Sequence, residues 1–569
     1  MTPSLRRAGV LLTGLMLTLP VRAQFGPAPP VPDVPGVTIR EVARIPGPYR
    51  PVRIAQDPTD GALYVLATTR PDGTEPSTST LFRLDPDGDG TFTPTPVLQD
   101  HEFGAPRAIG LAFAGDGTLF ILGNEEVGST HTRIVIQRGR RQDGNWVWEN
   151  VATSEPYLLS HTWFDHRANA LVVSPDGATV LVNSGSRTDH GEMYGGVREE
   201  GLTALILQIP ADATERVLPN DREALRAAGY VYAEGTRNTA DLAFAPNGDL
   251  FGPDNAGDRD DSEELNWLRE GQHYGFPWRI GTSITPMQFA GYDPDRDPFV
   301  QRDRNPTNRA DTGWYFSNDP TFPPPPEGVT FVDPIPNVGP YADRYRDPET
   351  GDVLDASDTG TTIGTFTGHR SPLGLVFDTD SVVAEPMRGG AFLLSFNSDA
   401  DLMLSRLGGT GEDLLYLDLE KDEGAYTVSA ERVAHGFVHP VDAVMVEHTI
   451  YVIEYGSWND VGDRRAVQAV TLPRHVGTAI GEAPDHVAAV VEVYPNPAGE
   501  RLTLWYRLPE AVEVRVELFD LLGRRVQART GQGREGRVHL PIDGLPAGVY
   551  VVRLMAGDHH VSRRVHVVR

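Results

Sequence analysis

The feature that most constrains the fold of this chain is a hairpin signal that recurs along it. An apolar strand leads into an Asp-Gly or Asn-Gly turn, and a second apolar strand follows. The turn glycines are Gly61, Gly117, Gly177 and Gly248, so successive units lie 56, 60 and 71 residues apart. Asp-Gly and Asn-Gly tolerate the positive φ angles of tight turns, so each unit predicts a β-hairpin.

Hairpins repeated at this spacing predict a β-propeller, in which each repeat forms one small antiparallel sheet, or blade. Two more degenerate units, at 373–395 and 441–453, bring the predicted number of blades to six, between residues 37 and 475. An array of β-sandwiches is the alternative, although it would need shorter and more regular periods.

The segment 281–365 interrupts this rhythm and is rich in Pro, Asp and Arg. We predict a long insertion over one face of the propeller, where loops usually carry function. A disordered insertion is the alternative. Its aromatic residues favour an ordered lid or wall.

The N-terminus carries an export signal. Arg6 and Arg7 precede a short apolar run that ends at Ala23, which predicts a signal peptide over residues 1–23, followed by a Pro-rich linker over 24–36. No later run approaches the length needed for a transmembrane segment. We therefore expect a protein that leaves the cytoplasm.

After a predicted linker (476–490), residues 491–569 alternate between apolar and polar side chains, as in a small β-sandwich. They include Val-Tyr-Pro-Asn-Pro at 493–497, Leu-Phe-Asp-Leu-Leu-Gly-Arg at 518–524 and a final strand pair from Leu545. These motifs closely resemble the C-terminal sorting domain of proteins exported by the type IX (Por) secretion system. The resemblance implies the type IX machinery as a partner and a secreted or cell-surface location. An ordinary adhesive or spacer domain is the alternative.

Composition excludes several functions. With 50 basic and 79 acidic residues the net charge is −29, which argues against a nucleic-acid or anionic-membrane partner. The absence of cysteine excludes disulfides, thiolate metal sites and cysteine nucleophiles. Lys421 is the single lysine, so chemistry that depends on a lysine amine is nearly excluded.

Three stretches in the propeller carry a second resemblance. They are Gly-Thr-Arg-Asn at 235–238, Glu-Glu-Leu-Asn at 263–266 with Tyr-Gly-Phe-Pro at 274–277, and His-Arg-Ala-Asn-Ala-Leu at 166–171. Together they resemble the glucose/sorbosone dehydrogenase family, six-bladed propellers that use pyrroloquinoline quinone (PQQ) with calcium. The resemblance implies an oxidoreductase whose small-molecule substrate is a sugar or another alcohol, bound in the axial cleft.

The resemblance assigns roles to three of these residues. His166 matches the general base that takes the proton of the sugar hydroxyl, a role that suits an imidazole with a pKa near neutrality. Arg237 and Asn238 match positions that contact the cofactor, whose carboxylates call for guanidinium and amide groups. The alternatives are a solvated surface histidine at 166 and a blade-entry turn at 237–238.

An acidic loop over 254–264 offers the hard oxygen ligands that calcium prefers. In the family, main-chain carbonyls here hold the cofactor's calcium, at Ala256-Gly257 or Asp258-Arg259 in this chain. Glu263, Glu264 and Tyr274 match a second, structural calcium site. An ordinary acidic loop is the alternative in so acidic a protein.

The chain departs from the family where PQQ's carboxylates should be bound. Asn397 stands in place of a lysine on the fifth blade, and His439 is the one possible cation at the arginine region of the sixth. An unpaired carboxylate in a closed cleft is costly, so either other arginines compensate, with Arg370 as a candidate, or the cofactor is absent. The alternative function is a non-catalytic propeller that binds carbohydrate or protein at the cell surface.

Overall fold

The computed structural model describes two stretches of the chain. The first is residues 27–475, apart from 70–76, 163, 301–315, 398–406, 410, 423 and 458–463, and the second is most of 490–567. The predicted signal peptide and nearly all of the predicted linker 476–490 lie outside the described residues. Contacts divide the chain into two compact units, residues 1–475 and 476–569.

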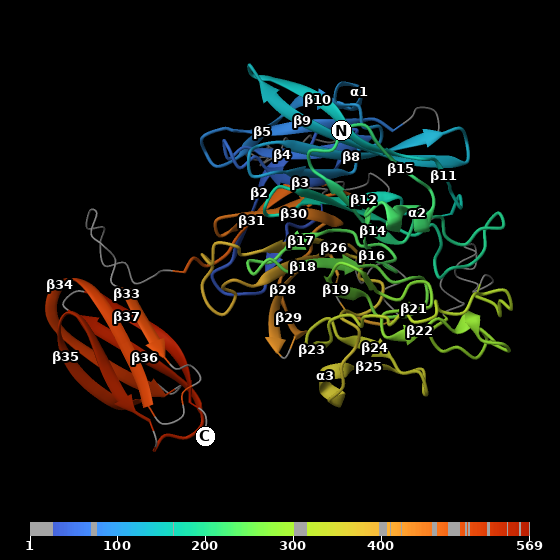
Figure 1. Cartoon of the computed structure of the whole chain (residues 1–569). Helices are drawn as coiled ribbons and strands as arrows, with labels where there is room; N and C mark the ends of the chain where they lie inside the picture. The colour runs from blue at the N-terminus through green and yellow to red at the C-terminus, as the bar shows by residue number, and fades with distance from the viewer. Residues whose placement is uncertain are drawn as a thin grey trace, which may run out of the picture. The chain divides into compact units, whose positions relative to one another are not determined.

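The first unit is a six-bladed β-propeller, as the repeats predict (Figure 1). Blades 1 and 2 consist of β3 (Tyr49–Gln56), β4 (Leu63–Thr69), β5 (Ser79–Pro86) and β6 (Phe92–Gln99), then β7 (Gly110–Phe113), β8 (Leu119–Val127), β9 (His131–Gln142) and β10 (Asn145–Ser154). Blades 3 and 4 consist of β12 (Ala168–Val173), β13 (Thr179–Ser184), β14 (Leu205–Pro210) and β16 (Val231–Glu234), then β17 (Ala243–Phe244), β18 (Leu250–Asp254) and β19 (Glu264–Leu268).

Blades 5 and 6 complete the ring. They consist of β26 (Pro372–Phe377), β27 (Ala391–Ser395), β28 (Asp413–Asp422) and β29 (Ala425–His435), then β30 (Pro440–Val446), β31 (Thr449–Glu454), β32 (Ala466–Thr471) and β2 (Thr38–Arg44). Short strands at blade edges are β1 (Val31–Pro32), β11 (Tyr157–Leu158), β15 (Arg216–Leu218), β20 (Gln272–His273) and β23 (Asn337–Pro340).

Each of the four hairpins with an Asp-Gly or Asn-Gly turn forms the first two strands of a blade, paired antiparallel around that turn. The inner strands are apolar on both faces because every blade is covered by a neighbour on each side. In β4, for example, all residues from Leu63 to Ala67 are buried. The hydrophobic core is therefore a series of layers between blades.

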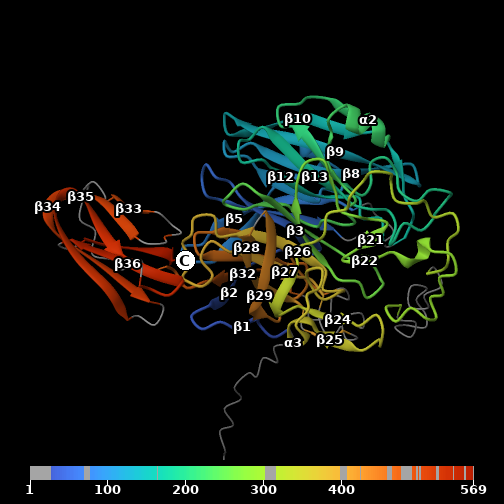
Figure 2. The ribbon, with the colours of Figure 1, turned by 60° about the horizontal axis from the view of Figure 1, so that its bottom comes forward.

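The ring closes through the N-terminal strand. β2 supplies the outer strand of blade 6 and pairs antiparallel with β32, with Thr38 opposite Thr471. The first strands of neighbouring blades contact one another, including β30 with β3, where the ring meets. Figure 2 shows the early strand β2 beside the late strand β32, and Figure 1 shows β3 beside β30.

Backbone irregularities at the start of the first strands aim polar residues towards the axis. The register shifts between Pro51 and Arg53 in β3 and between Ala168 and Ala170 in β12. Such bulges bend a strand and redirect its side chains. Arg53 reaches across the axis, where its Nη2 donates to the carbonyls of Asn169 (2.6 Å) and Ala240 (2.7 Å).

The segment between blades 4 and 5 carries its own small elements. They are β21 (Arg279–Ile280), β22 (Ser283–Ile284), the 3-10 turn η1 (Pro286–Gln288), β24 (Arg344–Arg346), β25 (Val353–Asp355) and α3 (Ala356–Thr359). The buried Arg346 Nε donates to Asp260 Oδ2 (2.7 Å), which ties this segment to the acidic loop after β18. The other helices are α1 (Asp100–Phe103) and α2 (Arg222–Ala227).

The second unit is a small all-β domain with one core. Its strands are β33 (Val490–Tyr494), β34 (Arg501–Asp520), β35 (Arg525–Pro541), β36 (Gly548–Ala556) and β37 (His559–Val567). The long β34 pairs with β33 and β36 along one edge and with β35 along the other, and it buries alternate residues such as Leu502, Leu504 and Tyr506. This is the predicted C-terminal β domain.

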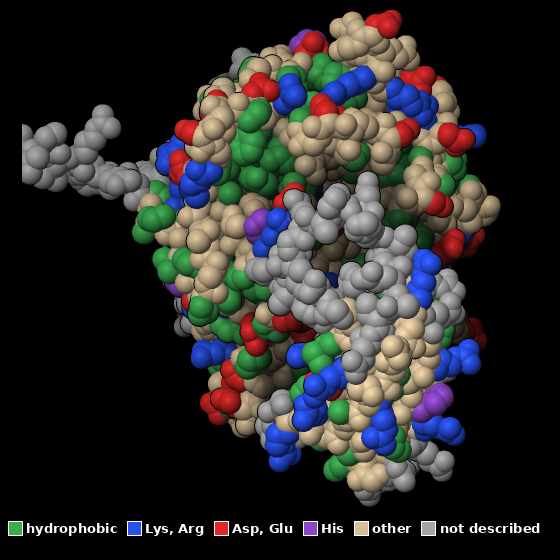
Figure 3. Space-filling model, turned by 90° about the vertical axis from the view of Figure 1, so that its left-hand side faces the viewer, with side chains coloured by type: hydrophobic (Ala, Val, Ile, Leu, Met, Phe, Trp, Pro, Cys, Tyr) green, Lys and Arg blue, Asp and Glu red, His purple; other side chains and the backbone are tan. Residues whose placement is uncertain are grey.

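No helix in the described part of the chain has the length and apolar character of a membrane span. On the face shown in Figure 3, basic and acidic side chains are interspersed, in keeping with an arginine content that offsets part of the acidic excess.

Candidate functional site

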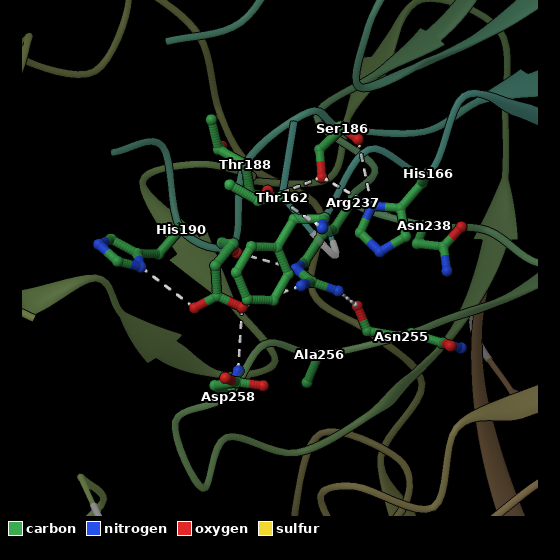
Figure 4. A network of polar contacts seen from close by, with 12 residues as sticks. Thr162, His166, Ser186, Thr188, His190, Arg237, Asn238, Asn255, Ala256 and Asp258 are labelled. Atoms are coloured by element: carbon green, nitrogen blue, oxygen red, sulfur yellow. Dashed lines mark hydrogen bonds and ion pairs between the residues drawn. The ribbon is translucent and has the colours of Figure 1, made fainter. Parts of the chain in front are cut away.

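His166 lies at the entry to β12, and one ring nitrogen is held from within the protein. Its Nδ1 lies 3.1 Å from the carbonyl oxygen and 3.2 Å from the hydroxyl of Ser186 (Figure 4). The Ser186 hydroxyl itself donates to the carbonyl of Thr188 (2.8 Å). Since a carbonyl can only accept, Nδ1 carries the proton, and the lone pair of the neutral ring resides on Nε2.

The surroundings of His166 keep it neutral. Burial lowers the pKa of the imidazole, and the positive charge of Arg237 lowers it further, to about 3. At neutral pH the ring is therefore uncharged, with its proton on Nδ1, and it can accept a second proton at Nε2, as a general base must.

Arg237 lies beside His166, but its guanidinium is engaged by the protein. Nε and Nη2 donate to the carbonyl (2.8 Å) and the Oδ1 (3.0 Å) of Asp189, and Nη1 donates to the carbonyl of Asn255 (3.0 Å). Gly257 packs closely on the same aspartate, because a Cβ there would lie 2.6 Å from Asp189 Oδ1. Arg237 is thus an internal ion pair that fixes the loops around the site.

Asn238 completes a polar group around His166. Its side-chain oxygen accepts from Asn169 Nδ2 (2.6 Å), and Figure 4 shows the amide beside the imidazole. The backbone links the three predicted residues, because Ser186 N, next to His166, donates to the Arg237 carbonyl (2.7 Å). The structure therefore brings His166, Arg237 and Asn238 into one cluster.

His190, on the far side of Arg237, has a different character. Its Nδ1 lies 3.1 Å from Asp189 Oδ2 and 3.4 Å from Glu192 Oε2. Burial would lower the pKa of His190, but the two carboxylates raise it above its ordinary value. His190 is suited to be an ion-paired cation, which leaves His166 as the better base.

The predicted calcium ligands do not converge. The Glu263 carboxylate accepts from the backbone N–H groups of Ala256 and Ser371 (2.5 and 3.0 Å), whereas Glu264 accepts from Gly281 N (2.7 Å) and Asn266 Nδ2 (2.7 Å). The Tyr274 hydroxyl donates to the Trp267 carbonyl (2.7 Å) and accepts from Arg269 N (2.8 Å).

Among the described residues, no group of three or more His, Asp or Glu side chains is placed to hold a metal ion. The backbone N–H of Asp258 donates to Asp189 Oδ1 (3.0 Å), so the 256–258 loop packs against the Arg237–Asp189 pair. A calcium ion held by main-chain carbonyls of Ala256, Gly257 or Asp258 stays a prediction.

The other predicted cations lie apart from His166. Arg370 is buried and its Nη2 donates to both oxygens of Asp413 (2.7 and 2.6 Å), and it lines a separate hollow with Tyr341 and Arg432. His439 Nδ1 lies 3.1 Å from the Gly456 carbonyl, and its Nε2 lies 3.9 Å from Glu412.

His166 opens onto a hollow of about 420 Å³, lined among others by Arg107, Asn124, His161, Asp165 and Arg167. This volume falls within the roughly 300–1,000 Å³ of ligand sites. The sequence did not single out Arg107 and Arg167. Both stand just before the first strand of a blade, the place in the repeat that His166 also occupies, and that shared position could have indicated them.

The structure thus defines a class of protein. It is a β-propeller with a polar cluster and a hollow at the entry of its first strands, joined to a separate β domain. Residues 107–292 match the family model described as Glucose / Sorbosone dehydrogenase, and residues 492–568 match the Secretion system C-terminal sorting domain. Both resemblances inferred from the sequence are thereby confirmed, and the sorting domain indicates type IX secretion to the cell surface or beyond.

Three solved structures are similar in outline. They are the holo PQQ domain of pyranose dehydrogenase from Coprinopsis cinerea (14% identity, 77% of this chain and 96% of that one, TM-score 0.45), the apo soluble aldose sugar dehydrogenase from Escherichia coli (12%, 77% and 99%, 0.44) and the PQQ-bound aldose sugar dehydrogenase from Streptomyces coelicolor (16%, 78% and 100%, 0.41). No curated protein matches the chain.

The residues present do not fit PQQ held by three cations. Arg237 is paired with Asp189 and Arg370 with Asp413, while Asn397, at the lysine position, donates its amide to the His369 carbonyl (2.9 Å). Binding a tricarboxylate here would require breaking buried ion pairs, each of which is costly to break.

Proposed function

We propose that the propeller is a secreted sugar or alcohol dehydrogenase-like protein whose substrate hydroxyl is deprotonated by His166. The observation that carries this proposal is the neutral imidazole, with Nδ1 tied to Ser186 and its basic lone pair on Nε2, in a residue that lines the hollow. The match of residues 107–292 to the dehydrogenase family supports the same assignment.

In this reaction the chain's own residues bind, orient and accept a proton. Ser186 holds the imidazole in one tautomer, and the Asn169–Asn238 amide pair borders the ring. As the hydroxyl proton moves to His166 Nε2, the two electrons of the C–H bond must leave as hydride to an oxidant. The family resemblance implies a quinone as that acceptor. PQQ could take this role only if Arg237 or Arg370 exchanged its buried carboxylate partner for a carboxylate of the cofactor.

A non-catalytic saccharide-binding propeller is the second candidate. The observation that favours it is the internal pairing of Arg237 and Arg370, which leaves neither guanidinium for a cofactor carboxylate without rearrangement.

One experiment separates the two. Purified protein is titrated with PQQ in calcium or in EDTA, bound quinone is measured by absorbance, and dye reduction is followed with aldoses. The dehydrogenase proposal expects stoichiometric quinone and sugar-dependent dye reduction. No quinone binding at micromolar PQQ would leave the saccharide-binding propeller as the function.

The role of His166 is tested in the same assay. His166→Ala should lower turnover at least about a hundredfold, the usual contribution of a general base, while quinone binding persists. His101→Ala, at an exposed position in α1, is the matched control. Equal turnover of the two variants would remove His166 from the mechanism.

A further inference from the structure

The hollow at His166 carries two guanidinium groups with one shared counter-ion. Arg107 Nη1 lies 2.8 Å from Glu126 Oε1, and Arg167 Nη2 lies 3.7 Å from the same oxygen. The Glu126 side chain is 44% exposed, so water screens it, whereas those of Arg107 and Arg167 are only 27% and 22% exposed. One screened carboxylate thus faces two partly desolvated cations.

The second acidic residue at the hollow forms no ion pair with either arginine. Asp165 lines the hollow, but its two carboxylate oxygens accept the backbone N–H groups of Ser160 (2.7 Å) and His161 (2.7 Å). The carboxylate is therefore turned into its own loop. Within the described residues, the Arg167 guanidinium makes no hydrogen bond at all.

The two arginines also disturb one another. Burial lowers the pKa of Arg107, and the charge of Arg167 acts in the same direction, although Glu126 opposes both. Both residues adopt left-handed backbone conformations, with φ of 47° and 59°, which are unfavourable for residues other than glycine. The two positive charges and the two unfavourable backbone conformations lie at the same hollow, in a chain of net charge −29. Together they indicate a site for an anion.

We infer that Arg107 and Arg167 bind the carboxylate of an acidic sugar, a uronic acid, whose hydroxyl is thereby placed at His166. The inference rests on the proposed function in that it takes this hollow as the substrate site, and it names the substrate class. A guanidinium pair matches the planar carboxylate with parallel N–H donors, whereas a neutral aldose offers no such partner. The imidazole in the same hollow remains neutral and does not compete for the anion.

The test is a binding measurement that does not depend on turnover. Calorimetric titrations of the full mature chain, without cofactor, compare D-glucuronate with D-glucuronamide, in which a neutral amide replaces the carboxylate. Glucuronate should bind at least about tenfold more tightly, since a charge-assisted hydrogen bond is worth that much. Its affinity should fall as salt is raised. Equal affinities, or no binding of either sugar, would overturn the inference.

Variants identify the residues responsible. R107Q and R167Q should each reduce the preference for glucuronate about tenfold, and R107K should retain part of it. R133Q is the matched control. Arg133 Nε donates to Glu125, the residue before Glu126 in β8 (2.7 Å), and Arg133 does not line the hollow. The inference fails if R133Q matches R107Q, or if R107Q keeps its preference. Thermal melts confirm that each variant is folded.

The same titration distinguishes a cofactor carboxylate from a substrate carboxylate. If R107Q weakens PQQ binding while glucuronate never binds, the arginines hold the cofactor and the inference is wrong. If glucuronate binds through the arginines and PQQ does not bind, the inference stands although the proposed dehydrogenase fails.

Discussion

At the scale of single residues, burial and the charge beside His166 determine its chemistry. Burial lowers the pKa of the imidazole most, and Arg237, which Asp189 holds in place, lowers it further. A base with a low pKa is available over the whole neutral range, at some cost in its strength as a proton acceptor.

This arrangement predicts an unusual titration. His166 should titrate below about pH 5, because burial and Arg237 lower its pKa to about 3. Arg237→Gln should raise that midpoint, since it removes a nearby positive charge. Two-dimensional NMR of the histidine ring signals, assigned with His166→Gln, measures both. A wild-type midpoint near the ordinary 6.5 would contradict the structure.

Glu264 gives a second prediction, for stability. Burial and the adjacent Asp254 raise its pKa to about 8, from the ordinary 4.5. Between these values the folded state holds a proton that the unfolded chain releases, so the free energy of unfolding should fall as pH rises from 4.5 to 8. In Glu264→Gln this loss should disappear, which makes the variant more stable than wild type at pH 8, on the order of a few kcal/mol.

Denaturant unfolding at pH 5 and pH 8 measures this difference. The glutamine can be accommodated, because the buried Asn266 Oδ1 has no hydrogen-bond partner and a flipped Asn266 amide can accept from it. Glu223→Gln, exposed in α2, is the control. An unchanged pH dependence in Glu264→Gln would show that this carboxyl is ionised in the folded protein.

The sequence shows which residue types stand at which place in the repeat, but it does not show which side chains form ion pairs. His166, Arg237 and Asn238 were assigned from the family resemblance of their motifs, and each precedes the first strand of a blade. That Asp189 pairs with Arg237, and Asp413 with Arg370, depends on loops folded against each other from distant positions. Glu263 and Glu264 were grouped as ligands, yet neighbours in extended backbone point to opposite sides.

At the scale of elements, β2 is the strand on which the ring depends. The sequence of β2 contains no turn motif that would predict its partner strand, whereas Asp-Gly and Asn-Gly turns predicted the hairpins of four blades. A turn joins residues that are close in sequence, but the pairing that closes the ring joins distant ones. The strand is buried on one side, with Val42 only 3% exposed between blades 6 and 1.

We therefore expect Val42→Asp to destabilise the whole propeller by about 3–5 kcal/mol, because an unpaired charge would be buried there. Thr38→Asp, at an exposed position of the same strand, should be nearly neutral. Urea unfolding followed by tryptophan fluorescence compares them. Equal unfolding midpoints for the two variants would show that closure of the ring does not depend on β2.

At the scale of the whole molecule, the chain combines two independent compact units with separate cores. We expect a chain that ends at His475 to keep the melting temperature and ligand binding of the full protein, since β32 is the last propeller strand among the residues that the structure describes. The same truncation should abolish delivery by the type IX system, measured by cell fractionation. A large loss of melting temperature on truncation would refute the independence of the propeller.

The pairing of β2 with β32 has a consequence for how the protein reaches its destination. The two strands come from opposite ends of the first unit, so almost the entire propeller must be assembled before they meet, and loop closure on this scale is slow. Until then β32 is an open edge able to recruit strands from other molecules. Proteolytic loss of the short segment ahead of blade 1 would make that edge permanent, and the exported protein would become prone to polymerise outside the cell.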